Sequence, residues 1–215
     1  MSQGHGHGHD EHAPIRHDGH SSPLARRARA LEALLTEKGV LTPADIRSAI
    51  DALVSRTPAD GAKLVARAWV DPAFKARLLA DPKAAAAELG IDLTSYARLG
   101  VVENTDKVHH VVVCTLCSCY PRMLLGPPPA WYKSLNYRAR TVADPRGVMR
   151  EFGLELPPKV EVRVLDSTAD MRYLVLPRRP PGTEHVSEAE LRSLVTRDSM
   201  IGVSDPPAAT GSCLT

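Results

Sequence analysis

The sequence predicts a layered α/β fold of the α+β kind, in which a helical arm at the N-terminus precedes an α-β-β-α domain. Two observations support this class. Apolar residues recur at helical spacing through the first half of the chain, and strand-like apolar runs appear only in the second half, between further helices. We therefore divide the chain into a His-rich tail (1–23), a helical arm (24–95), an α/β domain (96–204) and a C-terminal tail (205–215).

The N-terminal tail contains six of the nine histidines and almost no apolar side chains. Such a segment cannot offset the entropy lost on ordering, so we expect it to be disordered, as we do the tail after Ser204. His-rich tracts bind transition metals loosely. We favour a solubilising or added tail, with metal delivery as the alternative.

Proline and glycine boundaries define the helices of the arm. A run of leucines at helical spacing begins at Leu24, and Gly39 ends it. Further helices are expected from Thr42-Pro43 to about Val54, from Ala62 to Trp69, after Asp71-Pro72, and after Asp81-Pro82 as far as Gly90.

The second half alternates between strands and helices. The apolar run Val108–Val113 predicts a buried strand. Alternating valines at 160, 162 and 164 predict a half-exposed strand, and residues 173–176 are expected to form its hairpin partner across the turn 166–170. Asp144-Pro145 caps a helix that Gly153 ends, and Ser187 with Glu190 forms a capping box for the last predicted helix.

Three of the four cysteines, Cys114, Cys117 and Cys119, lie in one six-residue stretch directly behind the buried strand. A disulfide framework does not fit, because the fourth cysteine, Cys213, is near the C-terminus. A zinc site lacks a second ligand pair, since His109 and His110 are too close behind Cys114 to fold back easily. A redox pair would normally open a helix, whereas a loop continues here. Zinc and redox chemistry remain weak alternatives.

The spacing suits a claw around one metal ion. If Cys117 and Cys119 bind through sulfur, the peptide nitrogens of Ser118 and Cys119 fall between them, and Cys114 caps the ion axially. Peptide N–H groups lose their protons only to a strongly polarising transition metal. The remaining position is open for water or substrate, which indicates catalysis.

At this point the residues resemble a known family, the α subunit of nitrile hydratase, and also the closely related γ subunit of thiocyanate hydrolase. The resemblance covers about Leu24 to Ser204 and is carried by these segments: Val113-Cys-Thr-Leu-Cys-Ser-Cys-Tyr-Pro121, Pro128-Pro-Ala-Trp-Tyr-Lys-Ser134, Tyr137-Arg138, Asp144-Pro-Arg146, Arg172-Tyr173, Leu176-Pro177 and Arg197-Asp-Ser-Met-Ile-Gly202.

The resemblance implies a non-corrin cobalt(III) centre, one per subunit, with iron(III) as the less favoured ion. Its metal ligands would be Cys114, Cys117, Ser118 and Cys119, with Cys117 oxidised to a sulfinic acid and Cys119 to a sulfenic acid. Thr115 matches the cobalt version of the motif. The implied catalytic residues are Cys119, Cys117 and Ser118, with the sulfenate oxygen of Cys119 as base or nucleophile in the hydration of a small nitrile to an amide.

The resemblance also implies a partner. The family requires a β subunit, whose arginines bind the oxidised sulfurs and which the N-terminal arm embraces, so we expect a heterodimer or heterotetramer and an inactive isolated chain. A metallochaperone or activator would load the ion.

Arg122 departs from the nitrile hydratase pattern, which usually has Trp after the Tyr-Pro that follows the claw. An arginine beside the metal favours an anionic substrate, such as the thiocyanate that the γ-type subunit converts to carbonyl sulfide and ammonia. The alternative is that Arg122 pairs with a carboxylate or with a partner subunit.

Four further residues have two interpretations each. Tyr120 and Trp131, like the neighbouring Tyr132, line a substrate pocket or simply pack in the core. Asp166 and Arg172 support the claw as outer-shell groups or form an ordinary ion pair across the expected hairpin.

Composition bounds the remaining possibilities. A formal net charge of +2 does not indicate the excess of basic residues that is typical of nucleic-acid-binding proteins. No apolar run predicts a membrane span or a signal peptide. We expect a cytoplasmic protein with no nucleic-acid or membrane partner; a metal-carrying or storage protein is the non-enzymatic alternative.

Overall fold

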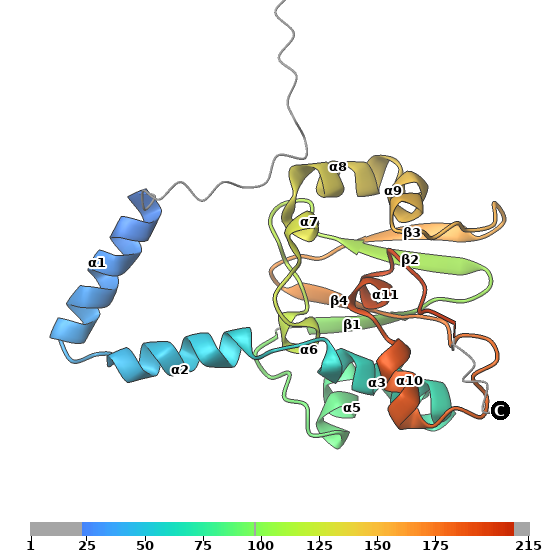
Figure 1. Cartoon of the computed structure of the whole chain (residues 1–215), viewed down its shortest axis with the longest axis horizontal. Helices are drawn as coiled ribbons and strands as arrows, with labels where there is room; N and C mark the ends of the chain where they lie inside the picture. The colour runs from blue at the N-terminus through green and yellow to red at the C-terminus, as the bar shows by residue number, and fades with distance from the viewer. Residues whose placement is uncertain (1–22, 97, 209–215) are drawn as a thin grey trace, which may run out of the picture. The chain divides into compact units, whose positions relative to one another are not determined.

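The computed structural model describes residues 23–96 and 98–208 (Figure 1). The chain divides into two units, Met1–Ile50 and Asp51–Thr215. The tail predictions for residues 1–22 and 209–215 lie outside the described residues. The division into an arm at 24–95 and a domain at 96–204 stays a prediction, and within the second unit the helices of residues 59–88 contact one another and the first strand.

Two helices follow the predicted boundaries at the start of the described chain. Helix α1 (Pro23–Glu37) is followed by Gly39 at a positive φ of 67°, and α2 (Pro43–Val54) spans the boundary between the units. Thr42 and Asp45 cap α2 reciprocally: the Thr42 N–H donates to Asp45 Oδ2 at 2.8 Å, and the Asp45 N–H donates to Thr42 Oγ1 at 3.1 Å. Helix α1 buries no residue.

Three consecutive helices open the second unit: α3 (Ala59–Val70), α4 (Pro72–Ala80) and α5 (Pro82–Glu88). The predicted Asp-Pro starts of α4 and α5 are confirmed, because Asp71 accepts from the Phe74 N–H and Asp81 from the Ala84 N–H. Helices α4 and α5 contact β1. No helix in the described residues has both the length and the apolar character needed to cross a bilayer.

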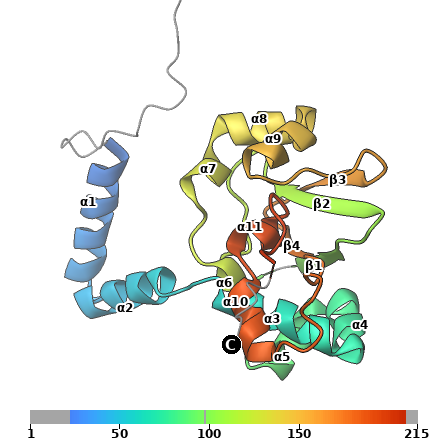
Figure 2. The same cartoon turned by 45° about the vertical axis from the view of Figure 1, so that its right-hand side comes forward.

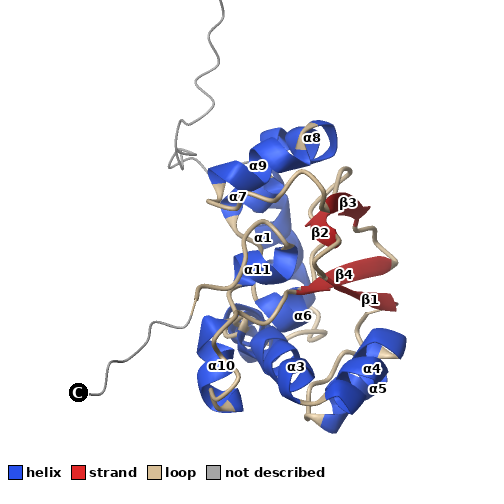
Figure 3. Ribbon diagram, turned by 90° about the vertical axis from the view of Figure 1, so that its right-hand side faces the viewer, coloured by secondary structure: helices blue, strands red, loops and turns tan. Residues whose placement is uncertain are grey.

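Four strands form two parallel pairs, which Figure 3 shows one above the other. Strand β1 (Arg98–Glu103) pairs with β4 (Met171–Leu176), and β2 (Val108–Val113) pairs with β3 (Glu161–Asp166). The predicted buried strand at 108–113 is confirmed.

The predicted hairpin between residues 160–164 and 173–176 is wrong. Each of those strands pairs in parallel with a partner more than 50 residues earlier in the chain, Val108 with Glu161 and Arg98 with Met171. The short polar segment between β3 and β4 resembles a hairpin turn in sequence. In the structure, however, β3 forms its strand hydrogen bonds with β2, and β4 forms them with β1. The partner β1 itself was not predicted, because Gly100 interrupts its apolar run; a Cβ there would come 3.0 Å from the Tyr173 ring.

The remaining helices are short: α8, α9 and α11 contact the strands, whereas α6 and α10 contact α3, and α7 contacts α8 (Figure 2). Helix α8 contacts β2 and α9 contacts β3, while α11 contacts both β2 and β4 and so joins the two pairs. The capping box at Ser187 and Glu190 and the Asp144 cap are confirmed. The bounds are α6 (Arg122–Leu125), α7 (Ala130–Lys133), α8 (Leu135–Ala143), α9 (Pro145–Glu151), α10 (Glu188–Leu194) and α11 (Arg197–Ile201).

The turn after α11 holds the start of β2. Gly202 has a φ of 88°, and a Cβ there would overlap the carbonyl oxygen of His110. His109 lies under the same turn: Asn104 Nδ2 donates to His109 Nδ1 at 3.1 Å, so the His109 Nε2–H donates to the Gly202 carbonyl at 2.8 Å. Burial lowers the His109 pKa, which keeps the ring neutral in this arrangement.

We predict that Gly202→Ala lowers the free energy of unfolding by at least about 3 kcal/mol, because it adds a backbone clash to the cost of left-handed φ. Gly182→Ala is the matched control: Gly182 has a φ of 76° and no atom within 4 Å of an added Cβ. Its loss should be about 1 to 2 kcal/mol. Urea denaturation measures both, and equal losses would contradict the close approach of α11 to β2.

Candidate metal centre

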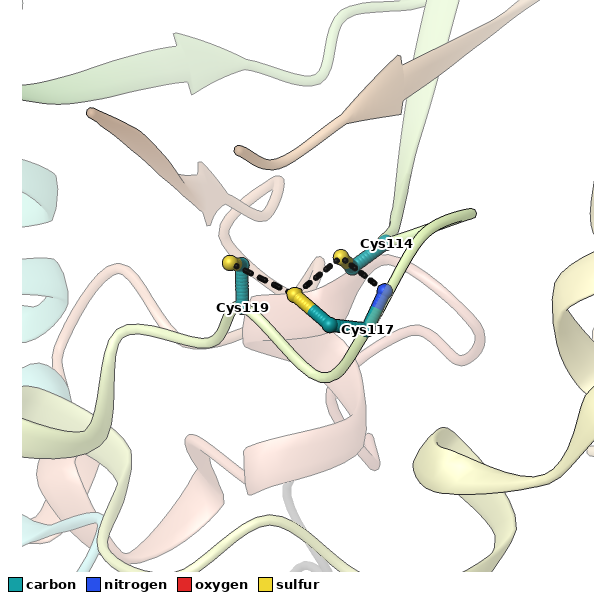
Figure 4. A group of neighbouring side chains, drawn as sticks. All are labelled: Cys114, Cys117 and Cys119. Carbon is teal, nitrogen blue, oxygen red and sulfur yellow. Dashed lines mark hydrogen bonds between the residues drawn. The ribbon is translucent and has the colours of Figure 1, made fainter. Parts of the chain in front are cut away.

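The cysteine loop begins where β2 ends. Cys114 follows Val113 directly and is buried, Cys117 is exposed, and Cys119 is buried again. The loop turns back on itself, so all three sulfurs lie within 4.8 Å of one another (Figure 4). Cys117 Sγ lies 3.4 Å from Cys114 Sγ and 3.1 Å from Cys119 Sγ. The three thiols are free, which places a set of soft donors around one point.

The donor set fits a thiophilic transition metal. In the part of the chain that the structure describes, no histidine or carboxylate joins the three cysteines as a fourth ligand. His109 and His110 make their ring contacts with Asn104 and Gly202 instead. A tetrahedral structural zinc site is therefore incomplete here, whereas a claw that also uses backbone nitrogens needs no fourth side chain.

Asp166 anchors the start of the loop. The parallel register places Asp166 opposite Val113, at the end of β3. Its Oδ1 accepts from the Thr115 N–H at 3.0 Å and its Oδ2 from the Thr115 hydroxyl at 2.5 Å. The carboxylate thus fixes the residue after Cys114 through two charge-assisted hydrogen bonds. The sequence analysis named Asp166 either as an outer-shell group of the claw or as half of an ion pair across a hairpin, and that hairpin does not exist.

Arg172 does not pair with Asp166. Its guanidinium donates to the Thr168 carbonyl, and no ion pair between Arg172 and Asp166 occurs among the described residues. Arg172 lines the same cavity as Cys117 and Cys119. Burial raises the pKa of Cys119, and the Arg172 charge acts against this rise.

A cavity of about 330 Å³ opens beside the loop. Six of the predicted site residues line it, and no Asp or Glu does. The lining residues are Ser95, Tyr96, Cys117, Ser118, Cys119, Tyr120, Arg122, Met123 and Arg172. Arg122 forms no ion pair among the described residues and stands at the start of α6, next to the cavity.

Three cavity residues, Ser95, Tyr96 and Met123, were missed by sequence reasoning. Tyr96 and Ser95 come from the loop before β1, and the Tyr96 hydroxyl accepts from the Met123 N–H at 2.5 Å. Burial raises the pKa of Tyr96 to about 12, so this phenol stays protonated. No local motif marks these residues, because only the fold brings them to the loop.

The aromatic candidates separate into two groups. Tyr120 lines the cavity, although its hydroxyl is buried and makes no hydrogen bond in the structure. Trp131 packs edge-on against Tyr137 and Phe152, with ring centroids 4.8 and 4.7 Å away, and does not line the cavity. Tyr132 is fully buried beneath the loop.

Cys117 and Cys119 differ in acidity. Hydrogen bonds from Cys119 and Cys114 lower the pKa of Cys117 to about 7. Burial raises the pKa of Cys119 to about 12. The exposed Cys117 sulfur therefore becomes a thiolate at lower pH than the buried Cys119 sulfur.

Comparison with known proteins identifies close relatives. The sequence model of the nitrile hydratase α chain matches residues 22–204. The chain is 53% identical over 188 residues to the low-molecular-weight cobalt-containing nitrile hydratase α subunit of Rhodococcus rhodochrous, covering 85% of this chain and 89% of that one. It is 51% identical over 187 residues to the cobalt-containing α subunit of Pseudonocardia thermophila, covering 86% and 92%.

Relatives of a second activity match almost as well. The thiocyanate hydrolase γ subunit of Thiobacillus thioparus is 44% identical over 188 residues, covering 82% of this chain and 77% of that one.

Among solved structures, a double mutant of the Fe-type nitrile hydratase from Comamonas testosteroni Ni1 has a TM-score of 0.79 at 46% identity, covering 86% of this chain and 91% of that one. A recombinant thiocyanate hydrolase with partially modified cobalt centres has a TM-score of 0.81 at 40% identity, covering 88% and 93%.

We predict that iodoacetamide alkylates Cys117 before Cys119 in the metal-free, fully reduced chain. Only the thiolate reacts, and a lowered pKa means that the thiolate of Cys117 is half formed at about pH 7 and increases as the pH rises. Cys119 should stay mostly unreactive up to about pH 10. Peptide mass spectrometry of timed samples between pH 5.5 and pH 10 gives both rates, and equal rates for the two thiols would contradict the arrangement.

Proposed function

The chain belongs to the nitrile hydratase α-chain family, and on this premise we propose that it is the metal-carrying subunit of a cobalt nitrile hydratase, which adds water to a small nitrile to give the amide. The observation that carries the proposal is the convergence of three free thiols at the end of β2, beside a cavity. The enzyme is proposed to act in the cytoplasm.

The residues proposed to hold one cobalt(III) ion are Cys114, Cys117 and Cys119 through sulfur, and Ser118 and Cys119 through their amide nitrogens. The short Sγ separations of 3.4 and 3.1 Å support a common centre. Thr115 and the cobalt-containing relatives favour cobalt over iron. When bound, the ion supplies Lewis acidity toward the nitrile and the water.

The side chains around the loop have distinct proposed tasks. Asp166 holds Thr115, and so the first cysteine, in place. Cys117 and Cys119 are oxidised to sulfinic and sulfenic acids, and the sulfenate oxygen of Cys119 acts as the base for water or as the nucleophile. Tyr120 and Met123 supply apolar surface in the cavity for the substrate carbon chain, while Ser118 contributes its backbone.

A β subunit is proposed to complete the site, giving a heterodimer or heterotetramer. Leu116, in the middle of the loop, is 86% exposed, and Cys117 beside it is also exposed. A large apolar side chain at the tip of a reactive loop is well placed for burial by a partner chain. Arginines of that partner would bind the oxidised sulfurs, so the isolated chain should be inactive, and an activator protein would deliver the metal.

The composition of the cavity favours thiocyanate hydrolysis as the second candidate function. Arg122 and Arg172 line it without any carboxylate, so an anion finds two positive charges and no negative one. The thiocyanate hydrolase γ subunit is among the relatives. On the same centre, hydration of thiocyanate would yield carbonyl sulfide and ammonia.

We predict that Cys117→Ser abolishes cobalt binding and nitrile hydration in the chain co-expressed with its β subunit, because it removes one chelating sulfur. Cys213→Ser, the same change outside the loop, should leave one cobalt per chain and normal activity. Elemental analysis, intact mass of the loop peptide and amide formation are the measurements.

The same preparation distinguishes an enzyme from a metal carrier. Cobalt that a chelator removes from the wild-type protein within minutes would support storage instead, as would unmodified Cys117 and Cys119. Rapid nitrile hydration by the chain without its β subunit would contradict the proposal that the isolated chain is inactive.

We predict that Arg122→Trp decides between the two substrates. If the chain acts on thiocyanate, the change removes a charge-assisted contact and lowers kcat/KM for thiocyanate at least about tenfold, with nitrile turnover unchanged or improved. Arg150→Trp, at an exposed site on α9 outside the cavity, is the matched control. Unchanged thiocyanate turnover in Arg122→Trp would exclude a substrate role for Arg122.

A further inference from the structure

We propose that Tyr132 and Tyr137 are positioning residues that set the span of the cysteine loop, by donating hydrogen bonds to backbone carbonyls on its two sides. Its consequence for catalysis rests on the proposed function, but the positioning itself is a property of this chain and is testable without metal. Neither hydroxyl lines the cavity, so neither residue is a catalytic residue.

The two hydrogen bonds bracket the loop. The Tyr137 hydroxyl donates to the Val112 carbonyl at 2.7 Å, two residues before Cys114. The Tyr132 hydroxyl donates to the carbonyl of Cys119, the last loop cysteine, at 2.8 Å. All three sulfurs lie in the segment between these two carbonyls, so its ends are both held from outside.

The Val112 contact uses a group that the sheet leaves free. The next carbonyl, that of Val113, accepts from the Ser167 N–H at 2.7 Å on the β3 side. Successive carbonyls of a strand point to opposite edges, so the Val112 carbonyl faces away from β3. A buried carbonyl without a donor costs free energy, and the Tyr137 hydroxyl satisfies it.

Both hydroxyls belong to one rigid aromatic cluster. The rings of Tyr132 and Tyr137 have centroids 5.6 Å apart, and Trp131 packs edge-on against both. Ser134 joins the two short helices: its hydroxyl oxygen accepts from the Tyr137 N–H at 3.0 Å as the N-cap of α8. Because the donors cannot move independently, the separation of the two carbonyls is fixed by this cluster.

The donors are permanent. Tyr132 is fully buried and Tyr137 nearly so, and burial raises the pKa of both phenols far above neutrality. Each therefore keeps its proton and donates it to its carbonyl partner, which can only accept. A claw of fused chelate rings tolerates little change in the position of its donors, so a fixed span favours one metal geometry over looser ones.

The test uses Tyr132→Phe and Tyr137→Phe, each of which removes one hydroxyl and keeps the ring. Tyr120→Phe is the matched control for the spectral, exchange and stability measurements. Its ring packs edge-on against Tyr132 at 5.0 Å, but its buried hydroxyl makes no hydrogen bond in the structure. All four proteins are prepared with the β subunit and cobalt, and again as the metal-free reduced chain.

In the cobalt-loaded protein, both test variants should shift or broaden the sulfur-to-cobalt charge-transfer band and lose cobalt to a chelator at least about tenfold faster than wild type. We expect kcat to fall with KM nearly unchanged in both. The control variant should keep the wild-type band and rate of cobalt loss. Wild-type bands in both test variants, with only a lower Tm, would show that the hydroxyls are merely structural and would overturn the proposal.

In the metal-free chain, the readout is hydrogen exchange of the Cys117 amide, which donates to Cys114 Sγ at 3.2 Å. Each test variant should exchange this amide about tenfold faster than wild type and than Tyr120→Phe. Unchanged exchange would overturn the proposal even if the protein binds no cobalt. If the wild type binds no cobalt but the Cys117 amide exchanges faster in both test variants, the proposed function is wrong and the positioning role of Tyr132 and Tyr137 still holds.

Discussion

The parallel pairing of β2 with β3 is the constraint on which the site depends. It brings the end of β3 alongside the end of β2, where Asp166 stands opposite Val113 and accepts two hydrogen bonds from Thr115. An antiparallel neighbour joined by a tight turn would place its end elsewhere. The starting position of the cysteine loop is therefore set by pairing between strands more than 50 residues apart in the chain, and the Asp166 carboxylate fixes the first residue after Cys114.

The far end of β2 is held just as closely. His109 and Asn104 link it to the turn at Gly202, whose lack of a side chain lets α11 approach the His110 carbonyl. These contacts leave β2 little freedom to slide, and a strand held at both ends presents Cys114 at a defined point. The burial of Cys114 and the exposure of Cys117 follow from this, since the loop leaves the core at one cysteine and returns at another.

The helix caps and the cysteine cluster could be predicted from the sequence, whereas the pairing of strands far apart in the chain could not. The Asp-Pro caps at 71 and 81 and the capping box at Ser187 depend on neighbours within four residues, so they were predicted correctly. The three cysteines were found for the same reason, because one turn brings them together. The strand partners depend on loop closure over long separations, which no short pattern encodes, and the spacer before β4 imitated a hairpin turn. Tyr96 reaches the cavity only through that unpredicted topology.

The two arginines of the cavity are not equivalent, because only Arg172 acts on Cys119, while both act on Tyr96. Arg172 acts to lower the pKa of Cys119, so its charge is directed at the buried sulfur and offsets part of the cost of a thiolate there. Burial raises the pKa of Tyr96, and the charges of both Arg172 and Arg122 act to lower it. A thiolate at Cys119 is stabilised by a nearby positive charge whichever substrate binds. Arg122 forms no ion pair among the described residues, so we expect Arg122, more than Arg172, to favour an anionic substrate over a neutral one.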